Sequence, residues 1–267
     1  MDKFGFIGTG NMGGALAMAV AKTIGGERVL LADHFMEKAK ELAGKLGAGT
    51  ADNATLAAQV RYLYLGVKPQ MMEGMLKEIA PVLAKRTDRF ILVTMAAGLS
   101  MEKIGRMAGG DYPVIRIMPN TPAGVGEGMI LYTANELVTN EELDGFVQAM
   151  QSAGRLDRSE EKLIDAGCAI SGCGPAFMYM MIEALADGGV LCGLPRAKAM
   201  EYAAQTMAGA AKMVLETGKH PGELKDAVCS PGGSTIVGVK ALEDCGFRSA
   251  CMNAVIEAYE KTKELGN

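Results

Sequence analysis

The chain has 267 residues, of which 49% are hydrophobic and 22% charged, and its net charge is −4. This composition predicts a packed globular protein of one large domain or two domains, and it excludes a disordered chain. The acidic balance argues against a partner bound through nucleic-acid phosphates, and no uninterrupted apolar run reaches the roughly 18 residues that span a bilayer. We therefore expect no nucleic-acid partner and no membrane partner.

The six cysteines form no C-x-x-C pair, and the sequence has only two histidines. A zinc site would lack its usual ligand spacing, so no metal site is expected. Reduced thiols in a cytoplasmic protein are the plain interpretation. Near the start, Ala17-Met18-Ala19 imitates a signal-peptide cleavage site, but Asn11 and five glycines interrupt the apolar stretch. We expect this region to be mature protein.

The stretch from Lys3 to Gly14 has the order strand, glycines, helix. Phe4 to Ile7 predicts a short apolar strand, and Ala15 to Ile24 predicts a helix. The glycine motif between them has the spacing G-x-G-x-x-G and consists of Gly8, Thr9, Gly10, Asn11, Met12 and Gly13. Its glycines permit a tight turn, a close approach of a pyrophosphate and close helix–strand packing. The motif therefore predicts a dinucleotide site, and the alternative is an ordinary strand-turn-helix with incidental glycines.

Strands and helices alternate through the first half of the chain. Strands are predicted over 28–32, 61–67, 90–94, 114–118 and 129–133, and helices over 39–46, 54–59, 72–83 and 139–150. This alternation predicts an α/β fold with a Rossmann-type, doubly wound, mainly parallel sheet. From residue 159 onward only helices are predicted, over 160–168, 176–191, 196–216, 222–228, 235–242 and 248–264. We expect a dinucleotide-binding domain at 1–157 and an all-helical domain at 158–267.

The predicted helix from Ala176 to Leu191 is apolar on most sides and carries charge only at Glu183 and Asp187. A helix that is apolar nearly all round is usually buried. A dimer interface would bury it more fully than a helical domain of roughly 110 residues. The helix therefore predicts a homo-oligomer that assembles through the helical domain.

Ligands of an open α/β sheet bind outside the carboxyl ends of its strands. Four stretches follow such ends: Asp33-His34, Val67-Lys68-Pro69, Thr94 to Gly98 and Met118 to Pro122. The small residues Ala96 and Ala97 let a flat ring approach the backbone. Two prolines fix the loop of Asn120, which suits an amide that contacts a ligand. Each stretch alone is equally a simple turn, and Lys68 alone is more typically a solvated lysine.

Three polar residues are candidates for the adenosine end of a cofactor. Asp33 would accept hydrogen bonds from the ribose, which favours NAD over NADP, or it caps the following helix; both roles are compatible. His34, if protonated, would partly attract a 2′-phosphate. Asn53 is equally a helix N-cap or a contact to the adenosine. The choice between the two coenzymes therefore stays open.

Two glycine-rich stretches of the helical half each precede a predicted helix: Ser171 to Ala176 and Ser230 to Thr235. Such a stretch suits a small anion such as a carboxylate, and the alternative is plain capping. The sequence has no G-x-S-x-G elbow and no His–carboxylate arrangement. Hydride transfer needs neither, because the cofactor carries the chemistry.

The segment from His220 to Glu243 resembles the signature of the pyrroline-5-carboxylate reductases. GFIGTGNMG, GVKPQ, MAAG, RIMPNTP, ISGCGPAF, EALADGG and GFRSACMNAV resemble the same family in its order, over essentially the whole chain. The resemblance implies a Rossmann domain followed by a helical domain that dimerises. It also implies reduction of 1-pyrroline-5-carboxylate to L-proline, the last step of proline biosynthesis, by NADPH or NADH.

The resemblance also assigns roles to individual residues. It implies that the cofactor is lined by Asn11, Met12, Asn53, Val67, Lys68, Pro69, Ala96 and Ala97. It implies that Ser234 and Thr235 meet the substrate. Two positions depart from the family: Cys173 stands where serine is usual, and Asp33 stands where many members have a small polar or basic residue near a 2′-phosphate. Because of Asp33 we expect NADH to be usable.

The implied substrate is a cyclic imine with a carboxylate beside its ring nitrogen. We expect its carboxylate on the backbone N–H groups of Gly233, Ser234 and Thr235, and the Thr235 hydroxyl on the ring nitrogen. The alternative is that Thr235 only caps its helix. Two other functions remain open: a related hydroxyacid dehydrogenase, for which no acid/base motif is found, and a non-catalytic NAD(P)-binding sensor.

Overall fold

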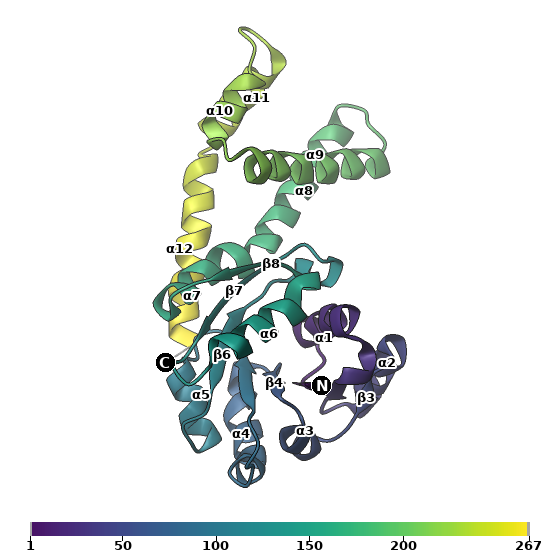
Figure 1. Cartoon of the computed structure of the whole chain (residues 1–267). Coiled ribbons are helices and arrows are strands. Elements are labelled where there is room, and N and C mark those ends of the chain that lie inside the picture. The colour runs from purple at the N-terminus through teal and green to yellow at the C-terminus, as the bar shows by residue number, and fades with distance from the viewer. Residues whose placement is uncertain (1, 266–267) are drawn as a thin grey trace. The chain divides into compact units, whose positions relative to one another are not determined.

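The computed structural model describes residues 2–265 (Figure 1). The chain divides into two compact units. Unit 1 comprises the chain up to Cys173 together with the chain from Ala258 on, and unit 2 comprises Gly174–Glu257. The domain boundary at residues 157–158 stays a prediction.

Unit 1 is built on an eight-stranded sheet in the order β3-β2-β1-β4-β5-β6-β7-β8. The strands are β1 (Phe4–Ile7), β2 (Val29–Ala32), β3 (Gly49–Thr50), β4 (Tyr62–Leu65), β5 (Ile91–Thr94), β6 (Val114–Met118), β7 (Gly128–Ala134) and β8 (Gly154–Arg158). All neighbouring strands are parallel except β6 and β7, which are antiparallel. The prediction of a mainly parallel, doubly wound sheet is confirmed.

Helices cover both faces of this sheet (Figure 1). They are α1 (Asn11–Ile24), α2 (Met36–Leu46), α3 (Asn53–Gln59), α4 (Pro69–Leu83), α5 (Met101–Ala108), α6 (Asn140–Met150) and α7 (Glu161–Gly167), with single turns η1 (Gly26–Arg28), η2 (Thr121–Val125) and η3 (Gln151–Ala153). Successive side chains of a strand point to opposite faces. Phe4 and Phe6 of β1 accordingly join the core under α1, α2 and α6. Ile7 joins the core under α3, α4 and α5.

Three elements of unit 1 are absent from the sequence-based prediction. Strand β8 has one apolar residue, Leu156, and lies at the sheet edge with most of its side chains exposed or half-buried, so it carries no apolar signal. Strand β3 has only two residues. Helix α5 was missed although its signals are local: Ser100 caps it, Gly109 ends it, and Met101, Ile104 and Ala108 share one face. The two strands, by contrast, depend on pairing with neighbours that are distant in sequence.

Unit 2 consists of α8 (Gly174–Leu191), α9 (Arg196–Thr217), α10 (Pro221–Ala227), α11 (Ser234–Asp244) and the first part of α12 (Phe247–Leu265). Between residues 159 and 265 the structure contains only helices and their connections, as predicted. The buried apolar cluster of unit 2 is formed by Ala186, Ala199 and Ala203. So small a core does not stabilise a helical domain alone, and large apolar side chains such as Leu191, 89% exposed, remain uncovered.

Helix α7 continues into α8 through a π-helical turn, η4 (Cys168–Gly172). The Cys173 N–H donates to the Cys168 carbonyl at 2.9 Å. The prediction of a new helix start at Ser171 to Ala176 is therefore wrong, because the chain there is already helical. By length and composition alone, the continuous helical segment Glu161–Leu191 could cross a bilayer. Charged residues interrupt it, so it is not the uninterrupted apolar run considered above, and the absence of a membrane partner stays a prediction. An apolar helix at a subunit interface passes the same test.

Candidate active site

The strand order reverses between β1 and β4, which are neighbours in the doubly wound sheet. Ile7 of β1 is paired with Leu65 of β4. Gly8 is the residue after β1 and Gly66 is the residue after β4. The two glycines therefore lie side by side at the carboxyl edge of the sheet. Doubly wound sheets bind their ligands at this position. The glycine motif thus lies where a dinucleotide site is expected.

Three glycines are required here by the fold itself. Gly8 has φ +96°, and a Cβ added to it would lie 2.7 Å from the Gly66 carbonyl. A Cβ on Gly13 would lie 2.0 Å from the Gly8 oxygen, and one on Gly66 would lie 2.6 Å from that same atom. The sequence-based prediction omitted Gly66 because it placed this residue inside the strand predicted over 61–67, whereas β4 ends at Leu65.

Close packing of the backbone, which requires glycine at positions 8 and 13, does not require it at Gly10. Its φ is −65°, which other residues adopt, and a Cβ there would meet no atom within 4 Å. The fold therefore does not require glycine at this position. A side chain would project into open space beside the start of α1, where a pyrophosphate is predicted to lie.

The amino-terminal end of α1 is free of internal partners. Gly10 is the N-cap and makes no side-chain capping bond, and the first turn has no acidic residue. The first bond of the helix runs from the Gly14 N–H to the Gly10 carbonyl at 2.8 Å. The amides of Asn11, Met12 and Gly13 precede it and lie at the positive end of the helix dipole. This arrangement can hold a phosphate group.

Asp33, at the end of β2, is bound to the glycine motif. Its Oδ2 accepts hydrogen bonds from the N–H and the hydroxyl of Thr9, at 2.7 and 2.9 Å. Its Oδ1 accepts the Phe35 N–H at 2.9 Å. Partial burial alone would raise the pKa of Asp33, but these hydrogen bonds and the charge of Lys38 lower it below its usual value. The N-cap of α2 is Phe35, so Asp33 is not the helix cap.

Of the remaining adenosine-side candidates, His34 is exposed and Asn53 is half-buried. His34 contacts the ring of Phe35 edge-on, with ring centroids 5.0 Å apart. Phe35 is 63% exposed and lies beneath the Lys38 ammonium, an apolar surface that sequence reasoning missed. Asn53 is the first residue of α3 rather than its cap, because the Asp52 carboxylate accepts the Thr55 N–H at 2.7 Å. The N-cap alternative for Asn53 is therefore wrong.

Five further cofactor candidates follow the adjacent strands β4 and β5: Val67, Lys68, Pro69, Ala96 and Ala97. Lys68 is the N-cap of α4 and Pro69 is its first residue. Both alanines have small side chains, and Ala96 is buried. The structure brings these residues to the same sheet edge as the glycine motif. Their contact with a cofactor stays a prediction.

Asn120 is buried and makes two hydrogen bonds within unit 1. Its Oδ1 accepts the Met129 N–H at 2.9 Å, and its Nδ2 donates to the Ser171 carbonyl at 2.9 Å. These bonds fix the loop after β6 against β7 and the π-helical turn. One amide hydrogen remains for a ligand, so the predicted substrate contact stays a prediction.

The three candidate substrate residues of unit 2 begin α11. Gly233 is the N-cap and makes no side-chain capping bond, with Ser234 and Thr235 as the first two helical residues. Thr235 is exposed. The alternative that Thr235 only caps the helix is therefore wrong. The Gly233 N–H already donates to the Ser230 carbonyl at 3.0 Å. The amides of Ser234 and Thr235 and the Thr235 hydroxyl remain at the start of the helix, an arrangement that suits a carboxylate ligand.

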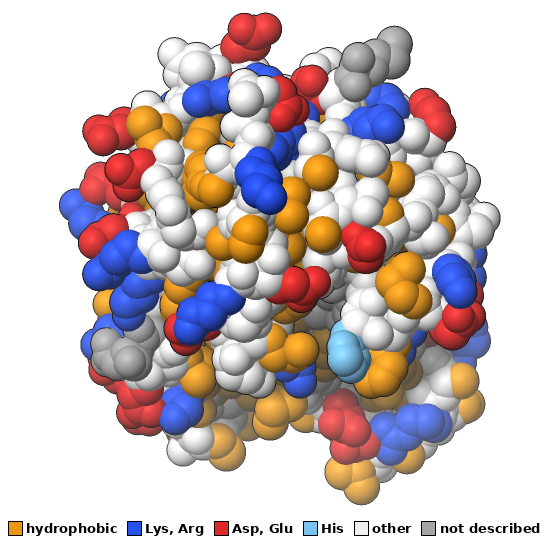
Figure 2. Space-filling model, turned by 90° about the horizontal axis from the view of Figure 1, so that it is seen from below, with side chains coloured by type: hydrophobic (Ala, Val, Ile, Leu, Met, Phe, Trp, Pro, Cys, Tyr) orange, Lys and Arg blue, Asp and Glu red, His pale blue; other side chains and the backbone are white. Residues whose placement is uncertain are grey.

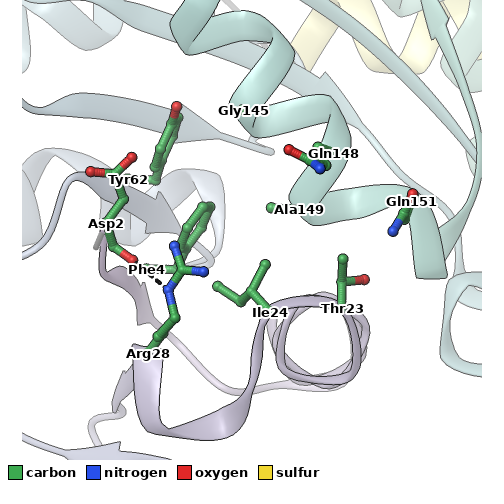
Figure 3. A pocket seen from close by; sticks show the side chains of 10 residues that line it. All are labelled: Asp2, Phe4, Thr23, Ile24, Arg28, Tyr62, Gly145, Gln148, Ala149 and Gln151. Atoms are coloured by element: carbon green, nitrogen blue, oxygen red, sulfur yellow. Dashed lines mark hydrogen bonds between the residues drawn. The ribbon is translucent and has the colours of Figure 1, made fainter.

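A pocket of about 350 Å³ lies elsewhere in unit 1 (Figure 3). Phe4 and Tyr62 form one wall, with ring centroids 4.6 Å apart, and the Arg28 Nε donates to the Asp2 carbonyl at 3.1 Å. Ile24, the last residue of α1, also lines it. Because the glycine motif is at the other end of α1, this pocket does not belong to the dinucleotide site.

The charged side chains on the face in Figure 2 are mixed in sign. Acidic and basic groups alternate there, and the visible part of the described chain presents no broad basic region. The absence of a nucleic-acid partner stays a prediction from the net charge of −4.

Comparisons with known proteins agree with these features. A family model for pyrroline-5-carboxylate reductase dimerisation matches residues 161–265, and one for NADP oxidoreductase, coenzyme F420-dependent, matches residues 3–98. The chain is 41% identical to the pyrroline-5-carboxylate reductase of Escherichia coli (strain K12), with 98% of each chain covered. It is 40% identical to that of Glycine max, covering 98% of this chain and 95% of the relative.

A solved structure gives the same result. The pyrroline carboxylate reductase of Plasmodium falciparum, with NADP bound, has a TM-score of 0.87 and 33% identity, covering 100% of this chain and 98% of that chain. The resemblance of the signature segment and the two-part fold are thereby confirmed. The chain belongs to the pyrroline-5-carboxylate reductase family.

Proposed function

We propose that this chain reduces 1-pyrroline-5-carboxylate to L-proline with NADPH or NADH. The observation that carries the proposal is the full-length match to reductases at 41% identity. The open amino-terminal end of α1 beside Gly10 supports it, because a dinucleotide phosphate fits there. The hydroxyacid dehydrogenase and sensor alternatives have no comparable support.

The reaction adds one hydride to the imine carbon and one proton to the ring nitrogen. The bound nicotinamide coenzyme supplies the hydride. In this proposal the amides of Asn11, Met12 and Gly13 hold the pyrophosphate. The residues at the ends of β4 and β5, among them Lys68 and Ala97, line the coenzyme.

Gly233, Ser234 and Thr235 are assigned to the substrate. The amides of Ser234 and Thr235 at the start of α11 hold the carboxylate, where the helix dipole favours negative charge, whereas the Gly233 amide is bonded to the Ser230 carbonyl. The exposed Thr235 hydroxyl bonds the ring nitrogen and orients the ring, and the proton comes from solvent. Asn120 is assigned a contact to the substrate through its remaining amide hydrogen.

Asp33 supports the use of NADH at least comparably to NADPH. Its lowered pKa keeps the carboxylate ionised near neutral pH, where it repels a 2′-phosphate and accepts a ribose hydroxyl. His34 and Asn53 are assigned to the same adenosine end.

The proposal includes two domains and an oligomer. We assign residues 1–157 to dinucleotide binding and 158–267 to substrate binding and dimerisation, in a cytoplasmic enzyme that forms at least a dimer. The match of a dimerisation family model to residues 161–265 supports this division.

The direct test is the loss of NAD(P)H absorbance with pyrroline-5-carboxylate, run with both coenzymes. We expect turnover with this imine and none with a 2-keto acid. Turnover with the keto acid alone would favour the hydroxyacid dehydrogenase. Coenzyme binding without any turnover would favour the sensor.

Thr235 gives the sharper test of the mechanism. Thr235→Val keeps the shape and removes the hydroxyl, so we expect catalytic efficiency to fall about 10- to 100-fold, the effect of a hydrogen bond to a charged group. Thr235→Ser should retain much of the activity, and NAD(P)H affinity should be nearly unaltered in both variants. A folded valine variant that works at the parental rate contradicts the assignment.

A further inference from the structure

We infer that Thr9 is a positioning residue that fixes the Asp33 carboxylate and thereby sets the selectivity between NADH and NADPH. Thr9 is the first variable residue of the glycine motif, and Asp33 ends the neighbouring strand. The inference rests on the proposed use of NAD(P)H.

The carboxylate of Asp33 is held from two directions. Thr9 donates both its N–H and its hydroxyl to Oδ2, and the Phe35 N–H binds Oδ1. A carboxylate has about four lone-pair positions, so the remaining one lies on Oδ1. Rotation of this side chain would break bonds to the loop before α1 or to the turn before α2. The carboxylate is therefore a fixed acceptor.

The fixed charge acts differently on the two coenzymes. The 2′-hydroxyl of NADH can donate to the open position on Oδ1, whereas the 2′-phosphate of NADPH meets a negative charge that cannot turn away. Lys38 is the nearby cation, and it lies over the Phe35 ring with its Nζ 5.4 Å from the ring centroid. The fixed orientation of Asp33 therefore determines whether the adenosine ribose of the coenzyme meets the Asp33 carboxylate before it meets the Lys38 ammonium.

The Thr9 hydroxyl is the one side-chain bond in this arrangement. Without it Oδ2 keeps only the backbone N–H, and the carboxylate gains freedom to rotate. NADH then loses a preplaced acceptor, while NADPH loses a fixed repulsive charge. The two affinities should shift in opposite directions, whereas general damage to the loop would lower both.

The test compares Thr9→Val, Thr9→Ser and Thr23→Val. Thr23 lies at the other end of α1, where its hydroxyl bonds Ser152 at 2.9 Å, so it controls for loss of a threonine hydroxyl. Dissociation constants for NADH and NADPH are measured by titration without substrate, and kcat and KM with pyrroline-5-carboxylate. For Thr9→Val we expect the NADH-to-NADPH affinity ratio to fall about three- to tenfold. Thr9→Ser and Thr23→Val should keep the ratio within about twofold of the parent.

The Asp33→Ser background shows whether Thr9 acts through Asp33. There the Thr9→Val change should leave the ratio unaltered, because the group it positions is gone. A persistent change means that Thr9 contacts the coenzyme directly, which overturns the inference, as does an unchanged ratio in Thr9→Val alone. Because the affinities are measured without substrate, a protein that binds both coenzymes but leaves the imine unreduced overturns the proposed function alone.

Discussion

Two tyrosines of β4 differ in whether the buried hydroxyl has a hydrogen-bond partner. Tyr62 and Tyr64 face the same core and stack on Phe4 and Phe6, with ring centroids 4.6 and 4.3 Å apart. The Tyr62 hydroxyl donates to the Glu142 carbonyl at 2.8 Å. The Tyr64 hydroxyl is fully buried and has no hydrogen-bond partner among residues 2–265, and burial raises the pKa of Tyr64 well above its usual value.

The same substitution at these two positions should therefore have opposite effects on stability. Tyr64→Phe removes an unpaired buried hydroxyl and should raise the free energy of unfolding by about 1 kcal/mol. Tyr62→Phe removes a satisfied bond and should lower it by about 1 kcal/mol. Urea denaturation of both variants measures the difference. Equal losses in the two would show that the Tyr64 hydroxyl has a partner in solution.

Residue roles at the coenzyme site were only partly predictable from the sequence. The spacing of Gly8, Gly10 and Gly13 between a predicted strand and a predicted helix was sufficient to place the motif, because strand, turn and helix are consecutive in the sequence. The close approach of Gly8 to Gly66 was not predictable, because Gly66 is distant in sequence. The hydrogen bonds of Asp33 could not be predicted, because its partner Thr9 lies 24 residues away and reaches it only when β1 and β2 pair. Asp52 and Asn53 are both good capping residues, and only the geometry shows that Asp52 is the cap.

Apart from α5, the helices and strands were likewise predictable where their sequence signal is local and were missed where it is not. Strands with continuous apolar runs and long helices were predicted, since their signal is local. Strand β8, at the sheet edge, was missed because its signal comes from pairing with β7. The π-helical turn at Cys168–Gly172 was predicted as a break between two helices, because Gly172 and Gly174 are typical of a break while the backbone bonds in fact continue.

Helix α6 is tied to the sheet by one buried carboxylate. Glu142, 5% exposed, completes a capping box with Thr139. Its Oε1 accepts hydrogen bonds from Arg61 and Arg89, both at 2.8 Å, just before β4 and β5. The hydrogen bond from Arg89, aided by the Thr139 amide and the charges of both arginines, outweighs burial and lowers the pKa of Glu142 from 4.5 to about 2.

This depressed pKa predicts a specific acid sensitivity. A group with a lower pKa in the folded state stabilises the protein above its unfolded pKa, and that contribution is lost as the pH falls through the folded value. The loss should run from about pH 5 to about pH 2 and be on the order of 3 kcal/mol. Glu142→Gln should lower stability at pH 7 and flatten this part of the pH profile in urea denaturation.

Glu141 provides the matched control, because it is an exposed glutamate in the same first turn of α6. Glu141→Gln should keep the parental pH profile. If Glu142→Gln has the parental profile as well, the ion pairs with Arg61 and Arg89 contribute nothing to acid stability.

The buried apolar core of unit 2 is too small to stabilise a helical unit of this length alone. Its buried apolar cluster is formed by three alanines, Ala186, Ala199 and Ala203. Met178 and Leu185 are exposed seven residues apart on α8, on the side away from Asp187, and so form an apolar stripe. A second copy of this chain, covering the stripe, would supply the missing burial.

This arrangement predicts that a charge on the stripe breaks the assembly. Met178→Glu would place a carboxylate in the covered interface, where its desolvation should weaken association at least about 100-fold. Met71→Glu is the control: Met71 lies on α4 of unit 1 and is 49% exposed, against 44% for Met178. Sedimentation at low protein concentration should show the parent and Met71→Glu as dimers or larger, and Met178→Glu as monomer or unfolded chain. A parental protein that sediments as a stable, active monomer would show that unit 2 needs no partner copy.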